Sequence, residues 1–298
     1  MGRKGISLEG RVLETRGRRV VVEGPAGPSV CFLSGQRAVV GDRVRFEDAP
    51  GTGGKLLEVL ARTTTLSRSD AQGREQVLAA NLRGLLIVSS VSEPPFRAGL
   101  VDRYLVAAGV AGLETAIVLN KTDLPIGDDV EAELSLREAG GVPVLRVGRG
   151  DEAGLAALQA FLGERPGAWA LVGHSGVGKT SLVARLCPEI DVGPVAAVSD
   201  YWGTGRHTTT ASRIFGVEGG GEVVDSPGIR SFAPAGLAPD DVRQFFPGMF
   251  ALGCKFRDCR HRPGEEGCVA DAEVPADLVA SYRRLLAEIQ EIDRRSRP

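Results

Sequence analysis

One short stretch of the sequence carries the residue types and the spacing of a phosphate-binding loop. It fits the pattern G-x-x-x-x-G-K-[ST] at every fixed position, and these positions hold Gly173, Gly178, Lys179 and Thr180. Glycines let successive backbone N–H groups turn toward phosphate oxygens, and a following helix adds the partial positive charge of its N-terminus. The sequence therefore predicts a loop for a nucleoside triphosphate, lined also by His174, Ser175, Gly176, Val177 and Ser181.

Two side chains of this loop have separate predicted tasks. Lys179 would reach the β- and γ-phosphates, and the Thr180 hydroxyl would ligate Mg²⁺. The apolar run 168–172 predicts a buried strand before the loop, and 181–186 predicts a helix after it. A glycine-rich turn before a helix is the alternative interpretation, and the complete match to the pattern argues against it.

A second polar motif lies upstream, where the predicted strand 115–119 delivers Asn120-Lys121-Thr122-Asp123. The Asp123 carboxylate can accept hydrogen bonds from N1–H and the exocyclic amine of guanine, and adenine offers neither donor. The Lys121 stem can lie over the base, and Asn120 can tie this loop to the phosphate loop. The rival explanation is a chance helix cap, because Asn and Asp are preferred there.

The two motifs occur in an unusual order. Most GTPases place the phosphate loop first and N-K-x-D last, whereas here N-K-T-D comes first. A parallel sheet tolerates this change because its strands can keep their places while the chain ends move. The sequence therefore predicts a circularly permuted GTPase. The run after Val147 lacks the usual Ser-Ala contact to the base, so bare N–H groups of Gly148 and Arg149 would have to replace it.

Two segments after the phosphate loop resemble the switches of a GTPase. The first is Gly205-Arg206-His207-Thr208-Thr209-Thr210, where a threonine hydroxyl would complete the magnesium shell, and we take Thr209 as the candidate catalytic residue. A threonine run on a β-edge is the alternative. The second is a strand that ends in D-x-x-G, in which Asp225 would hold Mg²⁺ through water and the Gly228 N–H would sense the γ-phosphate.

Ile229 stands where many GTPases have a glutamine that orients the attacking water. An isoleucine cannot do this, so the sequence predicts a slow intrinsic rate. His207 is the internal candidate for positioning water, and Arg206 is the candidate for stabilising charge. Contacts to a partner remain an equal alternative for both residues.

Near the C-terminus, four soft metal ligands follow the pattern C-x4-C-x-H-x6-C, made by Cys254, Cys259, His261 and Cys268. Such a set suits a closed tetrahedral zinc site with a structural role. Unconnected free thiols are the alternative. The remaining cysteines, Cys31 and Cys187, are expected to be buried small apolar residues.

The surrounding elements predict three domains. Short strands in residues 1–62 predict a β-barrel of the OB-fold type, in which Phe32 and Phe46 could both be core, and a purely structural barrel competes with an RNA-binding one. Residues 63–83 read as a polar linker. Strands alternating with helices in 84–235 predict a mostly parallel α/β sheet, and 236–298 predicts a helical zinc domain.

Charge and hydropathy limit the possible partners. The net charge is −2, but residues 1–62 hold eleven Lys and Arg against seven Asp and Glu. Basic residues also interleave the metal ligands, so both ends could touch a phosphate backbone, although ordinary solvated surface explains the charge equally well. Without a long apolar run or a signal core, we expect a cytoplasmic protein with no membrane partner.

The order of N-K-T-D, phosphate loop, G-R-H-T-T-T, D-S-P-G and the cysteine–histidine pattern resembles the small-subunit-dependent GTPases of the RsgA/YjeQ family. The resemblance covers nearly the whole chain. It implies GTP as substrate, Mg²⁺ and Zn²⁺ as cofactors, and hydrolysis stimulated by the small ribosomal subunit during its late maturation. It also implies that the barrel and the zinc domain contact ribosomal RNA. We expect a monomer with no DNA partner.

Two competing functions remain from the sequence. One is an RNA-binding adaptor that holds GTP as a structural ligand, which the missing glutamine would suit. The other is an ATPase, against which Asp123 argues because its carboxylate would be left unpaired by adenine.

Overall fold

In a computed structural model, the described residues are 7–49, 53–69, 74–188, 211–230, 232, 234, 236–250 and 252–296. They form two compact units, each built from segments distant in sequence. The first unit contains Met1–Gly84, Leu155–Leu171 and Lys179–Phe232. The second contains Leu85–Gly154, Val172–Gly178 and Ala233–Pro298. Within the described residues, no helix combines the length and apolarity needed to span a membrane.

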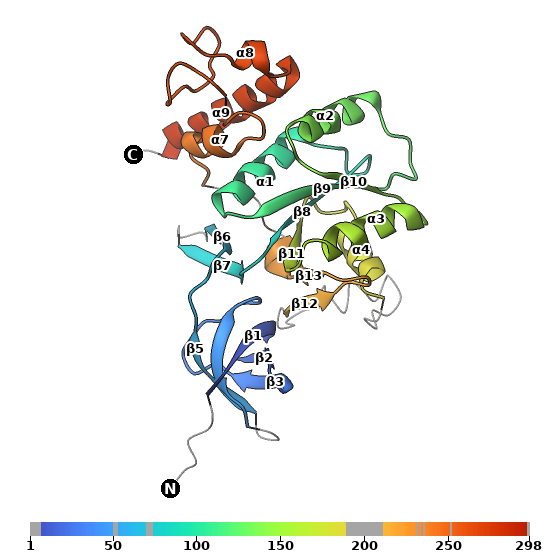
Figure 1. Ribbon diagram of the computed structural model, residues 1–298, viewed down its shortest axis with the longest axis vertical. Helices are drawn as coiled ribbons and strands as arrows, with labels where there is room; N and C mark the ends of the chain where they lie inside the picture. Colours follow the sequence, from blue (N-terminus) through green and yellow to red (C-terminus); the bar gives the residue numbers. More distant parts are fainter. Residues whose placement is uncertain are drawn as a thin grey trace. The chain divides into compact units, whose positions relative to one another are not determined.

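The first unit begins with a closed five-stranded barrel, which confirms the predicted N-terminal barrel (Figure 1). Its strands are β1 (Ser7–Arg16), β2 (Arg19–Gly24), β3 (Gly27–Phe32), β4 (Arg43–Glu47) and β5 (Gly54–Val59). The strand order is β1-β2-β3-β5-β4, and pairing of β1 with β4 closes the barrel. Alternating apolar residues fill the interior, namely Val12, Val20, Val22, Cys31, Val44, Phe46 and Leu56.

The two aromatic residues of the barrel have different environments. Phe46 is 1% exposed and belongs to the core, whereas Phe32 is 39% exposed. The Arg19 guanidinium lies 5.3 Å from the centre of the Phe32 ring, which is within the range of a cation–π contact. The expectation that both aromatics could be core residues is therefore wrong for Phe32.

The segment expected to be a linker contains an antiparallel hairpin of β6 (Thr65–Ser69) and β7 (Glu75–Ala80). Leu66 and Ala79 face each other in its register, and both are buried. The Asn81 side chain fixes the end of the hairpin by donating to the Gly41 carbonyl and accepting from the Thr63 N–H, each at 2.9 Å. The first strand holds Leu66 as its one apolar residue, so the segment read as polar in the sequence.

The same unit contains strands β11 (Ala168–Val172), β13 (Glu222–Asp225) and β12 (Ser212–Gly216), with helices α4 (Lys179–Leu186) and α6 (Pro227–Arg230). β11 and β13 are parallel, and β12 runs antiparallel to β13. The barrel strand β1 pairs with β12, with Glu14 opposite Arg213. An ion pair between Arg11 and Glu222, at 2.7 Å, adds a second link between barrel and sheet.

The second unit has a sheet in the order β10-β9-β8. Its strands are β8 (Gly84–Ser90), β9 (Glu114–Asn120) and β10 (Val144–Val147), and its helices include α1 (Ala98–Val110) and α2 (Asp128–Ala139). β9 and β10 are parallel, as the alternation of strands and helices predicted. Helix α3 (Glu152–Gly163) follows β10 in the chain.

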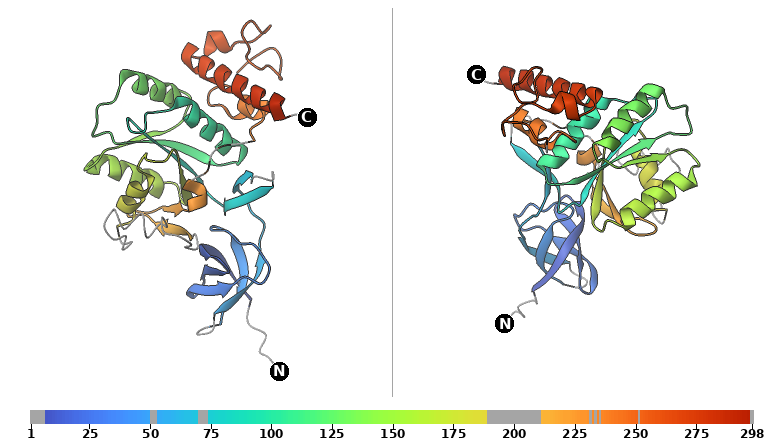
Figure 2. Two further views of the ribbon diagram at one scale, coloured as in Figure 1. Left: turned by 180° about the vertical axis from the view of Figure 1, so that it is seen from behind. Right: turned by 45° about the horizontal axis from the view of Figure 1, so that its top comes forward.

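The C-terminal segment of the second unit contains α7 (Pro239–Phe245), α8 (Ala270–Glu273) and the long helix α9 (Ala276–Ser296). Figure 2 shows α9 beside α7 and α1, and the three helices are in contact. The apolar face of α9 joins Val106 of α1 and Val242 of α7 in one core, to which it contributes Leu278, Val279, Tyr282, Leu285, Leu286 and Ile289. The cysteine–histidine loop precedes α8 and is attached to α9, because its Arg260 and His261 carbonyls accept from Tyr282 and Arg283.

Candidate nucleotide site and cysteine–histidine cluster

The backbone of the phosphate loop requires glycine at both ends. Gly173 has φ of +135° and Gly178 has φ of +95°, which L-residues rarely adopt. A Cβ atom at Gly173 would lie 2.1 Å from the Val88 carbonyl oxygen, and one at Gly178 would lie 2.3 Å from Asn120 Nδ2. Close backbone approach therefore explains why these two positions of the motif are glycine.

Asn120 joins the base-reading motif to the phosphate loop. It is the last residue of β9, and its Nδ2 donates to the Val177 carbonyl oxygen at 2.9 Å. The tie that the sequence predicted is therefore present. Val177 is 2% exposed, whereas the three residues before it, His174, Ser175 and Gly176, are exposed.

The other two residues of the motif are also held in place. Lys121 has φ of +63°, and its ammonium group donates to the Glu93 carbonyl oxygen. Asp123 is exposed, and its Oδ1 accepts from the Arg149 N–H at 2.7 Å. The Arg149 N–H, which the sequence predicts as a contact to the base, donates instead to this carboxylate. In the sequence, the departure from Ser-Ala at Gly148 and Arg149 is the one feature that points to this contact.

Three charged residues of the first unit, Asp225, Arg230 and Lys179, influence one another. Asp225 ends β13, is 5% exposed, and accepts two hydrogen bonds from the Arg230 guanidinium, one of them at 2.6 Å. Lys179 begins α4 and is 8% exposed. Burial lowers the pKa of Lys179 to about 8, and the positive charge of Arg230 acts in the same direction, while Asp225 opposes it.

Arg230 is the residue of this group that sequence analysis missed. It lies two positions after the glycine of D-x-x-G, and only that spacing could have pointed to it. Nearby, the Ser212 hydroxyl donates to the Ser226 hydroxyl at 2.8 Å, so the start of β12 is linked to the D-x-x-G motif. Ile229 is 1% exposed and packs as an apolar residue.

Several predicted residues of the first switch lie outside the described part of the chain. Arg206, His207 and Thr209 fall within 189–210, for which no structure is described. Thr180 and Ser181 belong to the first turn of α4, where a helix N-terminus favours a phosphate group. Gly228 lies in α6, where an added Cβ would stand 3.0 Å from a methyl group of Leu78.

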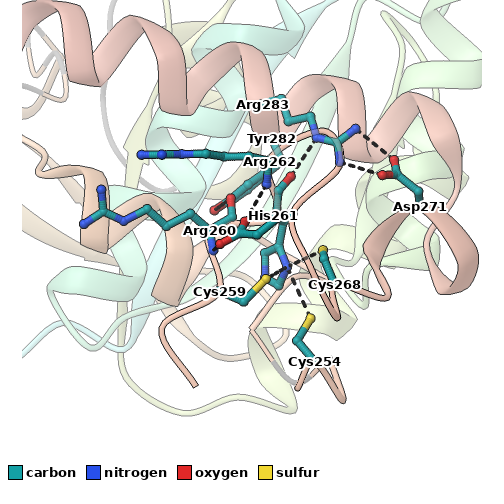
Figure 3. Close-up of polar contacts among 10 residues, drawn as sticks. Cys254, Cys259, Arg260, His261, Arg262, Cys268, Asp271, Tyr282 and Arg283 are labelled. Carbon is teal, nitrogen blue, oxygen red and sulfur yellow. Dashed lines mark hydrogen bonds and ion pairs between the residues drawn. The ribbon is translucent and has the colours of Figure 1, made fainter. Parts of the chain in front are cut away.

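The four predicted metal ligands lie together at one point (Figure 3). Their ligand atoms are all within 4.8 Å of one another, and the Sγ atoms of Cys254, Cys259 and Cys268 each lie 3.5 Å from His261 Nδ1. Tetrahedral zinc with Zn–S and Zn–N distances of about 2.3 and 2.0 Å separates sulfur and nitrogen by about 3.5 Å. The donor set and its spacing therefore fit a zinc ion.

Residues around the cluster fix its histidine. The Tyr282 ring meets the His261 ring edge-on at 5.6 Å, and Arg283 Nε donates to the His261 carbonyl at 2.7 Å (Figure 3). Asp271 in turn holds Arg283 at 2.8 Å. Burial lowers the pKa of His261, which favours the neutral imidazole that metals require. Outer contacts of this kind orient metal ligands in proteins.

The fold and the order of the nucleotide motifs define a circularly permuted P-loop GTPase. The family model described as RsgA GTPase matches residues 59–234, more than half of the chain. The chain belongs to the RsgA GTPase family and is a GTP hydrolase.

Curated relatives agree with this assignment. The chain is 40% identical to the small ribosomal subunit biogenesis GTPase RsgA of Azotobacter vinelandii, over 85% of this chain and 75% of the relative. It is also 40% identical to the protein of that name from Chromohalobacter salexigens, over 93% of this chain and 85% of the relative.

Two solved structures share the fold. YjeQ from Thermotoga maritima aligns with a TM-score of 0.74 at 25% identity, over 96% of this chain and 99% of that one. YloQ, described as a circularly permuted GTPase, aligns with a TM-score of 0.73 at 23% identity, over 100% of this chain and 99% of that one. The predicted permutation is therefore confirmed.

Proposed function

We propose that this GTPase binds the small ribosomal subunit during its late maturation and that the subunit stimulates hydrolysis of GTP to GDP and phosphate. The names of the curated relatives carry the proposal, since they describe GTPases of small-subunit biogenesis. The fixed geometry of the base-reading motif supports it, because Asn120, Lys121 and Asp123 are each hydrogen-bonded at the end of β9.

Base recognition is assigned to the loop after β9. Asp123 would accept from the two donors on the Watson–Crick edge of guanine, while its Oδ1 also accepts from the Arg149 N–H. Lys121 would cover the base through its alkyl stem. Asn120 would act indirectly, by holding the phosphate loop through Val177. Preorganisation of this kind reduces the ordering cost of binding.

Phosphate binding is assigned to residues 173–181. Exposed backbone at His174, Ser175 and Gly176 would face the phosphates, and Lys179 would balance their charge. Thr180 and Asp225 would hold Mg²⁺, which neutralises charge on the β- and γ-phosphate oxygens when bound. Gly228 would donate its N–H to the γ-phosphate.

Some of the residues that we assign to hydrolysis lie outside the described part of the chain. A buried isoleucine, Ile229, takes the place of a water-orienting glutamine. We assign His207 to positioning the water and Thr209 to the magnesium shell of the GTP-bound protein. Because in-line attack requires an oriented water, ordering of these residues by the subunit would raise the rate.

Two exposed surfaces suit contact with ribosomal RNA. On the barrel, Phe32 pairs in register with Arg19 on one side and Lys55 on the other, so an exposed aromatic is flanked by cations. Base stacking on an aromatic side chain combined with phosphate contacts is a common way to hold unpaired RNA. On the metal loop, Phe256 is 46% exposed among basic residues, namely Lys255, Arg257, Arg260 and Arg262.

We assign Zn²⁺ to Cys254, Cys259, His261 and Cys268, as a structural ion that holds this loop together. Metal analysis of the purified chain should give about one zinc per molecule, since a closed site takes all its ligands from the protein. The Cys259→Ser variant should lose the zinc, whereas Cys31→Ser, in the barrel core, should keep it.

Steady-state release of phosphate from GTP, with and without purified small subunits, tests the proposed function. We expect clear stimulation by small subunits and none by large subunits, which serve as a control for bulk RNA. Equal rates under all three conditions would contradict the proposal.

The roles assigned within the first switch need separate variants. His207→Ala should leave binding of the small subunit intact and remove most of the stimulation. Unchanged turnover of that variant, with and without small subunits, would exclude His207 from the mechanism.

A further inference from the structure

A second concave surface lies in the second unit, and none of its lining residues is assigned to GTP. It is an open groove of about 570 Å³ between the loop 91–98, helix α2 and helix α9, and we call it the α2–α9 groove. Its volume is within the range of pockets that bind ligands or peptide side chains. Its lining includes Val91, Phe96, Val130, Leu136, Ala280 and four charged side chains.

The groove has an apolar floor and a largely acidic rim. Val91 and Val130 are 9% and 7% exposed, and they form the floor with the half-buried Phe96. The charged lining side chains are Asp129 and Glu133 of α2, and Asp277 and Arg284 of α9. Three negative charges therefore face one positive charge.

Two of these charges already have contacts within the chain. Glu133 accepts from Arg137, which also pairs with the buried Asp102 at 2.8 Å, and Arg284 donates to the Ser281 hydroxyl at 2.8 Å. Asp129 and Asp277 are exposed and come from opposite walls. A ligand with an apolar part and positive charges would match this floor and rim.

The loop that forms one wall of the groove also touches the nucleotide motifs. The Glu93 carbonyl accepts from Lys121 of the base-reading motif. An added Cβ at Gly176 of the phosphate loop would lie 3.4 Å from Pro94 Cδ, and the Ser90 hydroxyl donates to the Pro94 carbonyl at 2.8 Å. The segment from Val91 to Ala98 therefore both lines the groove and contacts the nucleotide motifs.

From this geometry we propose that the α2–α9 groove binds a basic, partly apolar peptide segment of a partner protein, and that its occupancy changes the affinity of the chain for guanine nucleotide. The rim repels a phosphate backbone, so this surface selects protein over RNA. The peptide site stands by itself, whereas the coupling rests on the nucleotide site proposed above.

The proposed coupling between peptide and nucleotide must be reciprocal, so its size can be measured from either ligand. If the peptide changes nucleotide affinity by some factor, the nucleotide must change peptide affinity by the same factor. Energetic coupling between two sites is typically about 5-fold or more. Both affinities can be measured on the full chain, so the two factors provide an internal check.

Peptide binding is tested by fluorescence anisotropy with a labelled peptide of lysine and leucine. A peptide of the same length made of glutamate and leucine, a single-stranded RNA oligonucleotide and spermidine are compared with it. Measurements at an ionic strength of about 0.15 M suppress charge effects beyond about 8 Å. The lysine–leucine peptide should bind in preference to the other three.

Charge reversal locates the binding site. The double variant Asp129→Lys with Asp277→Lys should weaken peptide binding about tenfold or more, because like charges across an interface are strongly unfavourable. The matched control is Asp128→Lys with Glu273→Lys, which makes the same change of net charge at exposed positions outside the groove lining. That control should bind the peptide like the unmodified chain.

A steric variant makes the test independent of charge and folding. Ala280 is an exposed residue of α9 that lines the groove, so Ala280→Trp should obstruct it while thermal unfolding stays unchanged. Equal weakening by the two charge-reversal variants would overturn the peptide site, and so would full binding to Ala280→Trp. Tighter binding of spermidine or RNA at these residues would overturn the assignment to a protein segment.

Nucleotide titrations with and without saturating peptide test the coupling. We expect GDP or GTP affinity to change about 5-fold, with the same factor for the peptide when nucleotide is present. Equal nucleotide affinities in the two titrations would overturn the coupling and leave the peptide site standing. Failure of GTP binding itself would instead contradict the proposed nucleotide site.

Discussion

The residues proposed to read the base and those proposed to act in hydrolysis, called here the base-reading side and the hydrolysis side, are held differently. On the base-reading side, Asn120, Lys121 and Asp123 each have a backbone partner that fixes the side chain. On the hydrolysis side, Asp225 is paired with Arg230, and an apolar Ile229 occupies the glutamine position. On the proposed roles, we expect base binding to be prepared within the chain and turnover to depend on rearrangement or on a partner.

This contrast has a physical basis. Hydrogen bonds to backbone atoms fix recognition groups before the ligand arrives, so binding costs less ordering. Hydrolysis requires groups that act on the transition state alone, and a partner can supply or order them. Variants of the base-reading side should therefore change nucleotide affinity, and variants of the hydrolysis side should change the rate of GTP turnover.

The largest effect is expected for Lys179→Ala on the hydrolysis side. Loss of a positive charge at the phosphates should lower GTP turnover by about 10²- to 10³-fold, as for other groups that stabilise developing charge. Discrimination between guanine and adenine nucleotides should persist, because the base-reading loop is unchanged. Single-turnover assays and competition binding measure the two properties.

The control for this prediction is Arg294→Ala, which removes an exposed positive charge near the end of α9. It should turn over GTP normally. A Lys179→Ala protein that kept its rate would break the distinction between the two sides.

Asp123→Asn should have the next largest effect, and on affinity. Removing a charged acceptor typically costs about 1.5–3 kcal/mol, or roughly 10- to 100-fold in the dissociation constant for GTP. Xanthine nucleotides should gain affinity, because their C2 oxygen can accept from the new amide. Titration with both nucleotides gives the comparison, and Asp128→Asn is the control at a neighbouring exposed carboxylate. A variant that kept its preference for guanine would remove Asp123 from base recognition.

Asn120→Ala should give a smaller loss of affinity. It removes one hydrogen bond to the Val177 carbonyl, which is worth about 1 kcal/mol, or about 5-fold in nucleotide affinity. GDP and GTP should weaken equally, since the tie does not involve the γ-phosphate. A larger effect on GTP than on GDP, measured by calorimetry, would place Asn120 on the hydrolysis side instead.

The smallest expected effect is a shift in pH dependence. Because the pKa of Lys179 is lowered to about 8, its amine in the nucleotide-free protein is protonated below this pH and neutral above it. Phosphates favour the protonated amine, so nucleotide affinity should fall as pH rises through 8. Arg230→Gln removes one cause of the lowered pKa, so nucleotide affinity should begin to fall at a higher pH. At a given pH above 8, this variant should bind nucleotide about threefold more tightly than the unmodified chain. An unchanged pH dependence of nucleotide affinity would show that Arg230 does not lower the pKa of Lys179.

Sequence reasoning was most successful where function constrains local backbone. The phosphate loop needs glycines at Gly173 and Gly178 because their φ angles and close contacts exclude a side chain. The same holds for the four predicted metal ligands, whose spacing alone indicated the cluster that they form. Short-range geometry of this kind is recorded directly in residue types and spacings.

Sequence reasoning was weaker where burial depends on distant strands. Phe32 and Phe46 look equivalent in sequence, yet the barrel exposes Phe32 on β3, which pairs with β2 and β5, and buries Phe46 on β4, which pairs with β5 and β1. The hairpin of residues 65–80 was missed because Leu66 is the one apolar residue of its first strand, and because its end is held by a distant neighbour, the Gly41 carbonyl that accepts from Asn81.

By itself, the sequence determined the permuted order of the GTPase motifs, the guanine-reading residues as candidates, and the metal-binding pattern. Tertiary structure decided which groups those residues contact, since the Arg149 N–H on Asp123 and the pairing of β1 with β12 join positions that no local pattern relates. The physical reason is that loops need specific backbone torsions, which residue types reveal, whereas contacts between remote segments depend on how the whole chain packs.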